Sequence, residues 1–289
     1  MGRQKQLVVL SGKGGTGKTT LTSSFIELGG FEAFADCDVD APNLELILHM
    51  DTPAVCDDYF GMDKAKINPD LCIGCGTCAD LCRFSAITSD DAYGSYKINP
   101  FACEGCGLCV RACPVQAASM VSNKAGYTYT YDSHPFLASA RLKMGEGNSG
   151  LLVTQVKKNL KKSDAAISIV DGSPGIGCPV LASITGADMV IAVTEPSQSG
   201  LEDLKRLVLM LVTFDLKPYV VINKFNLSQS MTLKIQAYLE TEGLSLLGMI
   251  PFERQCLDNL AEKKTLVQSD TAAADSMRKI HAKALNILS

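Results

Sequence analysis

Two near-identical runs of cysteines constrain this chain more than any other feature. The stretch KINPDLCIGCGTCADLC begins at Lys66 and KINPFACEGCGLCVRAC begins at Lys97, so that equivalent cysteines lie 31 residues apart. Each run has the spacing C-x2-C-x2-C-x3-C, and glycines between the cysteines leave backbone N–H groups free to turn toward sulfur. Eight thiols at such short intervals predict a small, internally duplicated segment folded around metal.

The spacing also indicates which metal group the cysteines bind. It resembles that of bacterial two-cluster ferredoxins, in which the fourth cysteine of each run serves the other cluster. Structural zinc takes four ligands in wider pairs, and disulfides would need an oxidising compartment. In one departure, Arg83 stands where the ferredoxin pattern favours proline, which places a positive charge beside a cluster. The resemblance implies two 4Fe-4S clusters, the first on Cys72, Cys75, Cys78 and Cys113, the second on Cys103, Cys106, Cys109 and Cys82.

A phosphate-binding loop lies near the start of the chain. The stretch SGKGGTGKTT satisfies G-x-x-x-x-G-K-[ST] and lies between an apolar strand and a helix that should end at Gly29 and Gly30. In such a loop backbone N–H groups surround phosphate oxygens, Lys18 reaches the β- and γ-phosphates, and Thr19 binds Mg²⁺. The residues predicted to bind ATP or ADP here are Gly12, Gly14, Gly15, Thr16, Gly17, Lys18, Thr19 and Thr20.

A lysine early in this loop, Lys13, adds a family resemblance. The loop resembles KGGxGK[ST] of the MinD/ParA/Mrp superfamily, whose first lysine crosses a dimer interface to touch the partner's nucleotide. The resemblance implies that Lys13 acts in trans. Hydrolysis would then require two subunits, as a homodimer or as a heterodimer with a paralogue. The alternative is a lysine that is merely solvated.

Polar residues follow a second strand, where parallel sheets present their ligands. The stretch ADCDVDAPNL resembles the superfamily pattern DxDxxxxN at Asp36, Asp38 and Asn43. The resemblance implies that Asp38 orients or deprotonates the attacking water and that Asp36 supports Mg²⁺.

Two further strands end in candidate site residues. Asp171 follows AISIV at the position of a Walker B acid that holds a magnesium-bound water, and DGSPG resembles the DxPPG switch with Ser173 in place of the first proline. Asn223 follows PYVVI and resembles the adenine-contacting residue of the superfamily's NK pair. An ordinary turn-forming Asn is the alternative.

Outside the cysteine runs, short apolar segments alternate with helix-length amphipathic ones, which is typical of a parallel sheet covered on both faces. We therefore expect an α/β fold, a doubly wound, mostly parallel P-loop NTPase, with an inserted small α+β ferredoxin-like domain. The predicted domain parts are 1–65 and 121–289 for the ATPase and 66–120 for the insert. An exposed strand at 127–131 should lead back to the host. The main predicted strands are 165–170, 189–194, 218–222 and 244–250, and the helices 150–162, 200–214, 231–242 and 273–288.

The bulk properties exclude some classes of function. With 289 residues and a formal net charge of -4, the chain has no general attraction to nucleic acid or anionic lipid. No run reaches the roughly 18 apolar residues of a spanning helix, and the polar start resembles no signal peptide. We expect a cytoplasmic protein. The last helix should pack on the sheet, with a weak amphipathic membrane anchor as the alternative.

Three functions remain compatible with the sequence. ATP-driven dimer closure and hydrolysis could be coupled to electron transfer to a redox partner protein. The chain could instead be an ATPase for assembly or carriage of metal clusters with a metal-cluster partner, although it has no C-x-x-C outside the insert of the kind the Mrp branch uses. The third function is a MinD/ParA-type positioning scaffold. Cys178 resembles in its offset from Asp171 the cluster cysteine of the nitrogenase iron protein, but no cysteine between Cys113 and Cys178 supplies a second ligand.

Overall fold

The computed structural model describes residues 4–48, 50, 52–92, 94–132, 134–256, 259 and 262–288. The chain divides into two compact units. The first, here the sheet unit, comprises Met1–Cys56, Thr128–Arg141 and Gly150–Ser289; the second, the cysteine unit, comprises Asp57–Tyr127 and Leu142–Ser149. The predicted insert, 66–120, lies wholly inside the cysteine unit. That unit is longer because it also takes in 57–65, 121–127 and the later segment Leu142–Ser149.

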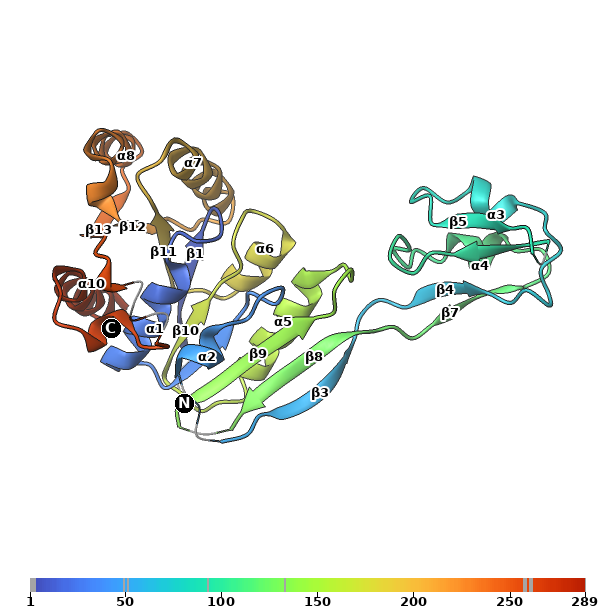
Figure 1. Cartoon of the computed structure of the whole chain (residues 1–289), viewed down its shortest axis with the longest axis horizontal. Helices are drawn as coiled ribbons and strands as arrows, with labels where there is room; N and C mark the ends of the chain where they lie inside the picture. Colours follow the sequence, from blue (N-terminus) through green and yellow to red (C-terminus); the bar gives the residue numbers. More distant parts are fainter. Residues whose placement is uncertain are drawn as a thin grey trace. The chain divides into compact units, whose positions relative to one another are not determined.

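A nine-stranded sheet in the order β13-β12-β11-β1-β10-β2-β9-β8-β3 forms the framework (Figure 1). Neighbouring strands from β13 to β9 pair in parallel. Because the central strands are buried on both faces, they read as continuous apolar runs, as predicted. The strands are β1 (Lys5–Ser11), β2 (Ala33–Asp36), β3 (Val55–Phe60), β8 (Lys124–Tyr131), β9 (Phe136–Leu142), β10 (Ile167–Asp171), β11 (Met189–Thr194), β12 (Tyr219–Asn223) and β13 (Ser245–Ile250).

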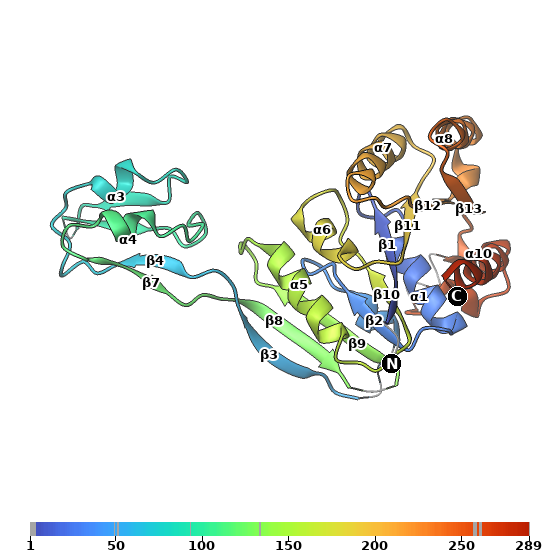
Figure 2. The same cartoon turned by 180° about the vertical axis from the view of Figure 1, so that it is seen from behind.

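Helices cover both faces of this sheet. Helices α1 (Lys18–Leu28) and α10 (Ala272–Leu288) lie on one face, and α5 (Ser149–Leu160), α6 (Cys178–Ile184) and α7 (Gln198–Val212) lie on the other (Figures 1 and 2). The remaining helical segments of this unit are α2 (Leu44–Leu48), η1 (Phe225–Leu227), α8 (Gln229–Thr241) and η2 (Leu266–Gln268).

The last helix packs as the sequence predicts. Met277, Ile280 and Ala284 of α10 are buried in the main hydrophobic core, together with Phe25 of α1. The apolar stripe of α10 therefore contacts the sheet unit. Among the described residues, no helix combines the length and apolar character needed to cross a membrane.

Two strands of the sheet, β3 and β9, escaped prediction. Strand β9 reads FLASARL, and its small residues interrupt the apolar run, yet Phe136 to Ala140 are all buried. The strand predicted at 127–131 forms the end of β8. It is mostly half-buried rather than exposed, because it lies between β9 and β3 in the sheet.

The cysteine unit contains two copies of the same small structural repeat. Strand β4 (Lys64–Ile67) pairs with β7 (Ala118–Val121), and β5 (Ile87–Asp90) pairs with β6 (Ser95–Ile98), both antiparallel. After β4 and after β6, an Asn starts a tight turn: the carbonyls of Asn68 and Asn99 accept from the N–H groups of Cys72 and Cys103, both at 3.1 Å. Each turn leads through a cysteine loop into a short helix, α3 (Thr77–Asp80) or α4 (Leu108–Ala112).

Candidate nucleotide and cluster sites

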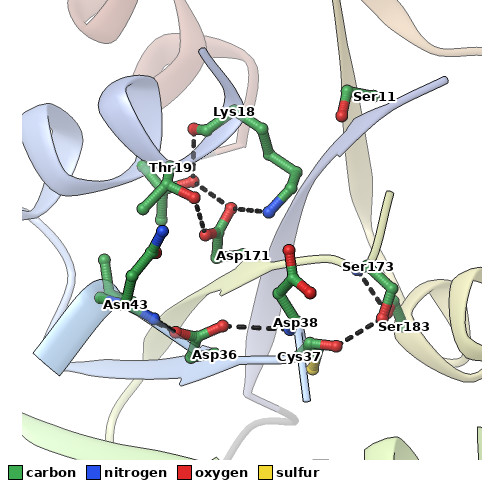
Figure 3. Close-up of polar contacts among 12 residues, drawn as sticks. Ser11, Lys18, Thr19, Asp36, Cys37, Asp38, Asn43, Asp171, Ser173 and Ser183 are labelled. Carbon is green, nitrogen blue, oxygen red and sulfur yellow. Dashed lines mark hydrogen bonds and ion pairs between the residues drawn. The ribbon is translucent and has the colours of Figure 1, made fainter. Parts of the chain in front are cut away.

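The phosphate loop lies between the carboxyl end of β1 and the first turn of α1. Lys18 Nζ contacts Asp171 Oδ1 at 2.8 Å, and the hydroxyl of Thr19 donates to Asp171 Oδ2 at 2.6 Å (Figure 3). The lysine is 6% exposed and the acid is fully buried. Burial by itself lowers the pKa of Lys18, but attraction by Asp171 and Asp36 outweighs it, so the pKa lies above the ordinary value. The residues of the turn are Gly12, Gly14, Gly15, Thr16 and Gly17, and those that open the helix are Lys18, Thr19 and Thr20.

The two acids after β2 have different environments. Asp36 is fully buried, and its carboxylate accepts from the backbone N–H groups of Asp38 at 3.0 Å and Asn43 at 2.9 Å (Figure 3), and of Leu44 at 3.0 Å. Burial, followed by the charge of Asp171, raises the pKa of Asp36 to about 7. The Asp38 carboxylate is half-buried and points toward Lys18 in Figure 3. The structure therefore makes Asp36 the organiser of this loop and leaves the Asp38 carboxylate directed at the phosphate loop.

Lys13 and Lys224, which lie on different loops, share an ion-pair partner, Glu195, that the sequence analysis missed. Lys13 Nζ lies 2.8 Å from Glu195 Oε1 and 2.8 Å from Ser199 Oγ. The other carboxylate oxygen of Glu195 lies 3.4 Å from Lys224 Nζ, which donates to Gly15 O at 3.1 Å. The only signal was the position of Glu195 directly after β11, at the ligand-binding edge of the sheet. Lys13 is thus held within its own chain.

Asn223, at the end of β12, lies directly against the phosphate loop. Its side-chain amide donates to Thr16 O at 2.8 Å, and its Oδ1 accepts from the N–H of Lys224 at 2.9 Å. These two bonds fix the side chain beside the loop, which makes Asn223 a brace of the loop. Contact with adenine remains a prediction.

Behind the site, buried polar groups connect the loops to two helices. The hydroxyl of Ser173 donates to the carbonyl of Cys37, and the N–H of Ser173 donates to Ser183 Oγ at 3.3 Å (Figure 3). Lys157 of α5 donates to Ser183 O at 2.6 Å and to the side-chain oxygen of Gln6. The loops after β2 and β10 are therefore linked to α6 and, through Lys157, to α5. The periodicity of α5 gave no sign that this lysine faces inward.

The eight clustered cysteines surround two separate cavities in the cysteine unit. Among the described residues, no three Cys, His, Asp or Glu side chains converge closely enough to hold a single metal ion. A cube of four irons and four sulfides needs thiolates spaced more widely than a mononuclear ion does. One cavity is bordered by Cys72, Cys75, Cys78 and Cys113, and the other by Cys82, Cys103, Cys106 and Cys109; Cys78 borders the second cavity as well.

Backbone donors approach the sulfurs of these quartets. The N–H of Ala117 donates to Cys113 Sγ at 3.2 Å, and the N–H of Ala86 donates to Cys82 Sγ at 3.4 Å. Hydrogen bonds from the hydroxyl and N–H of Thr77 lower the pKa of Cys75, whereas burial raises that of Cys109. Donors of this kind stabilise charged sulfur, so the residues present fit iron–sulfur clusters. Cluster binding by these eight residues remains a prediction.

Comparison with known proteins agrees with this geometry. A family model described as a 4Fe-4S dicluster domain matches residues 65–120. The uncharacterized protein MJ0578 of Methanocaldococcus jannaschii is 31% identical over 282 residues, which cover 96% of this chain and 95% of that protein. The chain belongs to the MJ0578 family. A second protein of the same organism, MJ0579, is 28% identical over 229 residues, covering 77% of this chain and 81% of that protein.

Solved structures of other proteins resemble the fold of this MJ0578-family member. The septum site-determining protein MinD of Pyrococcus horikoshii, solved with Mg-ADP, matches with a TM-score of 0.58 and 18% identity, over 99% of each chain. At that identity the match shows the fold. The chain thus combines a MinD/ParA-type P-loop fold with a 4Fe-4S domain, and both the predicted fold class and the stated resemblance are confirmed.

Proposed function

We propose that this protein is a Mg²⁺-dependent ATPase carrying two 4Fe-4S clusters, in which ATP-driven dimer closure and hydrolysis are coupled to electron transfer to a partner protein. The observation that carries the proposal is the presence of both sets of groups in one chain. Lys18, Thr19 and Asp171 meet at a phosphate loop, and two four-cysteine cavities lie in the second unit.

In this proposal each site residue has its own role in binding or hydrolysing the nucleotide. Lys18 binds the β- and γ-phosphates, and Thr19 and Asp171 hold Mg²⁺ and its water. Asp38 orients the attacking water, while Asp36 fixes the Asp38 backbone through the hydrogen bond to its N–H. The bound metal ion would neutralise charge on the phosphates.

Helix α5 supports coupling between the nucleotide site and the clusters. It begins at Ser149, where the last segment of the cysteine unit ends. A Cβ on Gly150 would lie 3.0 Å from Cys178 Cβ, so the first turns of α5 and α6 touch. Lys157 then joins the far end of α5 to Ser183 of α6, which in turn contacts Ser173. A shift of the Ser173 loop on nucleotide binding would therefore move the helix attached to the cysteine unit.

Cluster carriage has less support. Each quartet lies within the cysteine unit, and a cluster bound by four thiolates of one chain has no open position for an acceptor. Lys13 supports a two-subunit enzyme only through the resemblance of its loop. The existence of two relatives, MJ0578 and MJ0579, in one organism supports a heterodimer as an option beside the homodimer.

Anaerobic EPR tests the coupling. The dithionite-reduced protein should give a spectrum, or cluster midpoint potentials, that differ between ATP and ADP. The Lys18→Ala variant should contain the same iron and show no such difference. If the wild type binds ATP by calorimetry and its spectra are the same with ATP, with ADP and without nucleotide, the proposed coupling is wrong.

A further inference from the structure

A groove runs along two strands of the cysteine unit. Strands β4 and β6 supply most of its lining, and its volume is about 420 Å³. Three lysines, Lys64, Lys66 and Lys97, border it together with Asn123 and Asp90. Nothing in the proposed function uses these lysines.

The groove shares its walls with both cysteine cavities. Successive side chains of a strand point to opposite faces, so Lys64 and Lys66 alternate with Ala65 and Ile67. Ile67 and Tyr96 border both the groove and the cavity of Cys72. Ala65 and Ile98 border both the groove and the cavity of Cys103. A single layer of strand therefore separates a molecule in the groove from either quartet.

Charge is unevenly distributed over this unit. Over its two segments, 57–127 and 142–149, the unit has five lysines, two arginines and nine acidic residues. Three of those lysines line the groove, but only one of the acids, Asp90, does. The groove is therefore a positive site in a unit that is otherwise acidic.

Two of the lysines are free to meet an external charge. Lys64 is paired with Glu146 at 2.8 Å. Lys66 and Lys97 are exposed, and within the part of the chain that the structure describes neither forms an ion pair. They occupy the same place in the two KINP repeats, so each repeat contributes one ammonium group.

We propose that the groove is the docking site for the acidic face of a one-electron carrier protein. The inference rests on the proposed function, because it names the kind of redox partner that function requires. One electron would leave a reduced cluster, which is oxidised by one, and enter the carrier, which is reduced by one; no bond or proton need change. A protein surface fits better than a small anion because the lysine side chains are exposed rather than converging in a buried pocket.

Electrostatic docking has a measurable signature. Opposite charges raise the association rate, and added salt screens that gain. Reversing both free lysines should therefore slow reaction with an acidic carrier at low ionic strength. The same change should hasten reaction with a cationic oxidant.

The experiment compares Lys66→Glu/Lys97→Glu with a control pair, Lys234→Glu/Lys279→Glu, which makes the same charge change on exposed positions of α8 and α10. Dithionite-reduced holoprotein is mixed by stopped flow with three acceptors: a bacterial flavodoxin as acidic protein probe, the trianion tris(oxalato)cobaltate(III), and the trication hexaamminecobalt(III). Cluster midpoint potentials and iron content are measured for every variant.

The groove variant should react with flavodoxin and with the trianion about tenfold more slowly at low salt and faster with the trication. High salt should remove the difference, while the control pair stays close to wild type and all midpoint potentials stay unchanged. Equal effects of the two pairs would overturn the proposal, as would an effect on the trianion without one on flavodoxin. A shift in cluster midpoint potential large enough to explain the slower rates would also overturn the proposal. The lysines would then change the potential of the clusters rather than bind the carrier. If wild-type clusters react with none of the acceptors, the proposed electron-transfer function itself fails.

Discussion

At the scale of single residues, Lys157 stands out as a buried ammonium group. Its ammonium group donates to neutral oxygens of Ser183 and Gln6, and burial lowers its pKa to about 8 from 10.5. Between these pH values the unfolded chain binds more protons than the folded one, so this residue makes stability rise with pH across that window. Below about pH 8 the cost of burying the charge is present in full.

The lowered pKa of Lys157 can be measured directly. With [13Cε]lysine labelling, NMR should show a Lys157 resonance that titrates near pH 8. Lys157→Met should remove that resonance and leave the others in place. If every lysine titrates near its ordinary pKa, the buried environment of Lys157 is wrong.

Single residues also show where sequence reasoning stops. The two cysteine quartets were predicted from the resemblance to two-cluster ferredoxins, and the four cysteines of each quartet border one cavity, although Cys78 borders both cavities. Glu195 and Lys157 could not be found in this way. Their partners lie far away in the chain, so their roles depend on packing of the sheet and helices, which no local pattern records.

At the scale of elements, two glycines of the second cysteine loop distinguish the effect of backbone strain from that of a steric clash. Gly105 and Gly107 both adopt φ near 70°, and a side chain there costs roughly 1–2 kcal/mol. A Cβ on Gly105 would in addition overlap Asp63 O, whereas a Cβ on Gly107 meets nothing within 4 Å.

Gly105→Ala should therefore lose much of the iron and sulfide bound at the Cys103 quartet, and Gly107→Ala should keep most of it. Iron and acid-labile sulfide per chain, together with EPR of the reduced protein, provide the measurement. Equal cluster content in the two variants would mean that the approach of Asp63 does not limit this loop.

Elements were predicted well where burial is uniform. The apolar run of β11 begins and ends at the predicted residues, and α10 differs by one residue at its start. Strand β9 was missed because small side chains, which fit a crowded sheet, carry little hydrophobic signal. The register of β9 beside β2 is a tertiary property.

At the scale of the whole molecule, the proposed dimer makes hydrolysis depend on protein concentration. Lys13→Ala should lower ATP turnover by about 10²-fold, since it removes one donor to the developing charge, and should leave ATP affinity within a few-fold. Wild-type specific activity should rise with enzyme concentration. Lys205→Ala, which removes a half-buried lysine of α7 that pairs with Glu202 at 3.0 Å, serves as the control.

Turnover by Lys13→Ala at the wild-type rate would show that Lys13 does not act across an interface. A wild-type specific activity independent of concentration would count against closure of two chains. Neither result would bear on cluster binding, since the two cysteine quartets lie in the other unit.

The chain crosses between its two units four times, and β9, the neighbour of β2, follows the cysteine segment in sequence. A ribosome therefore delivers the metal-binding portion before the sheet has all its parts. If the cysteine segment needs iron to fold, the sheet unit should be recovered misfolded or degraded together with it in iron-starved cells.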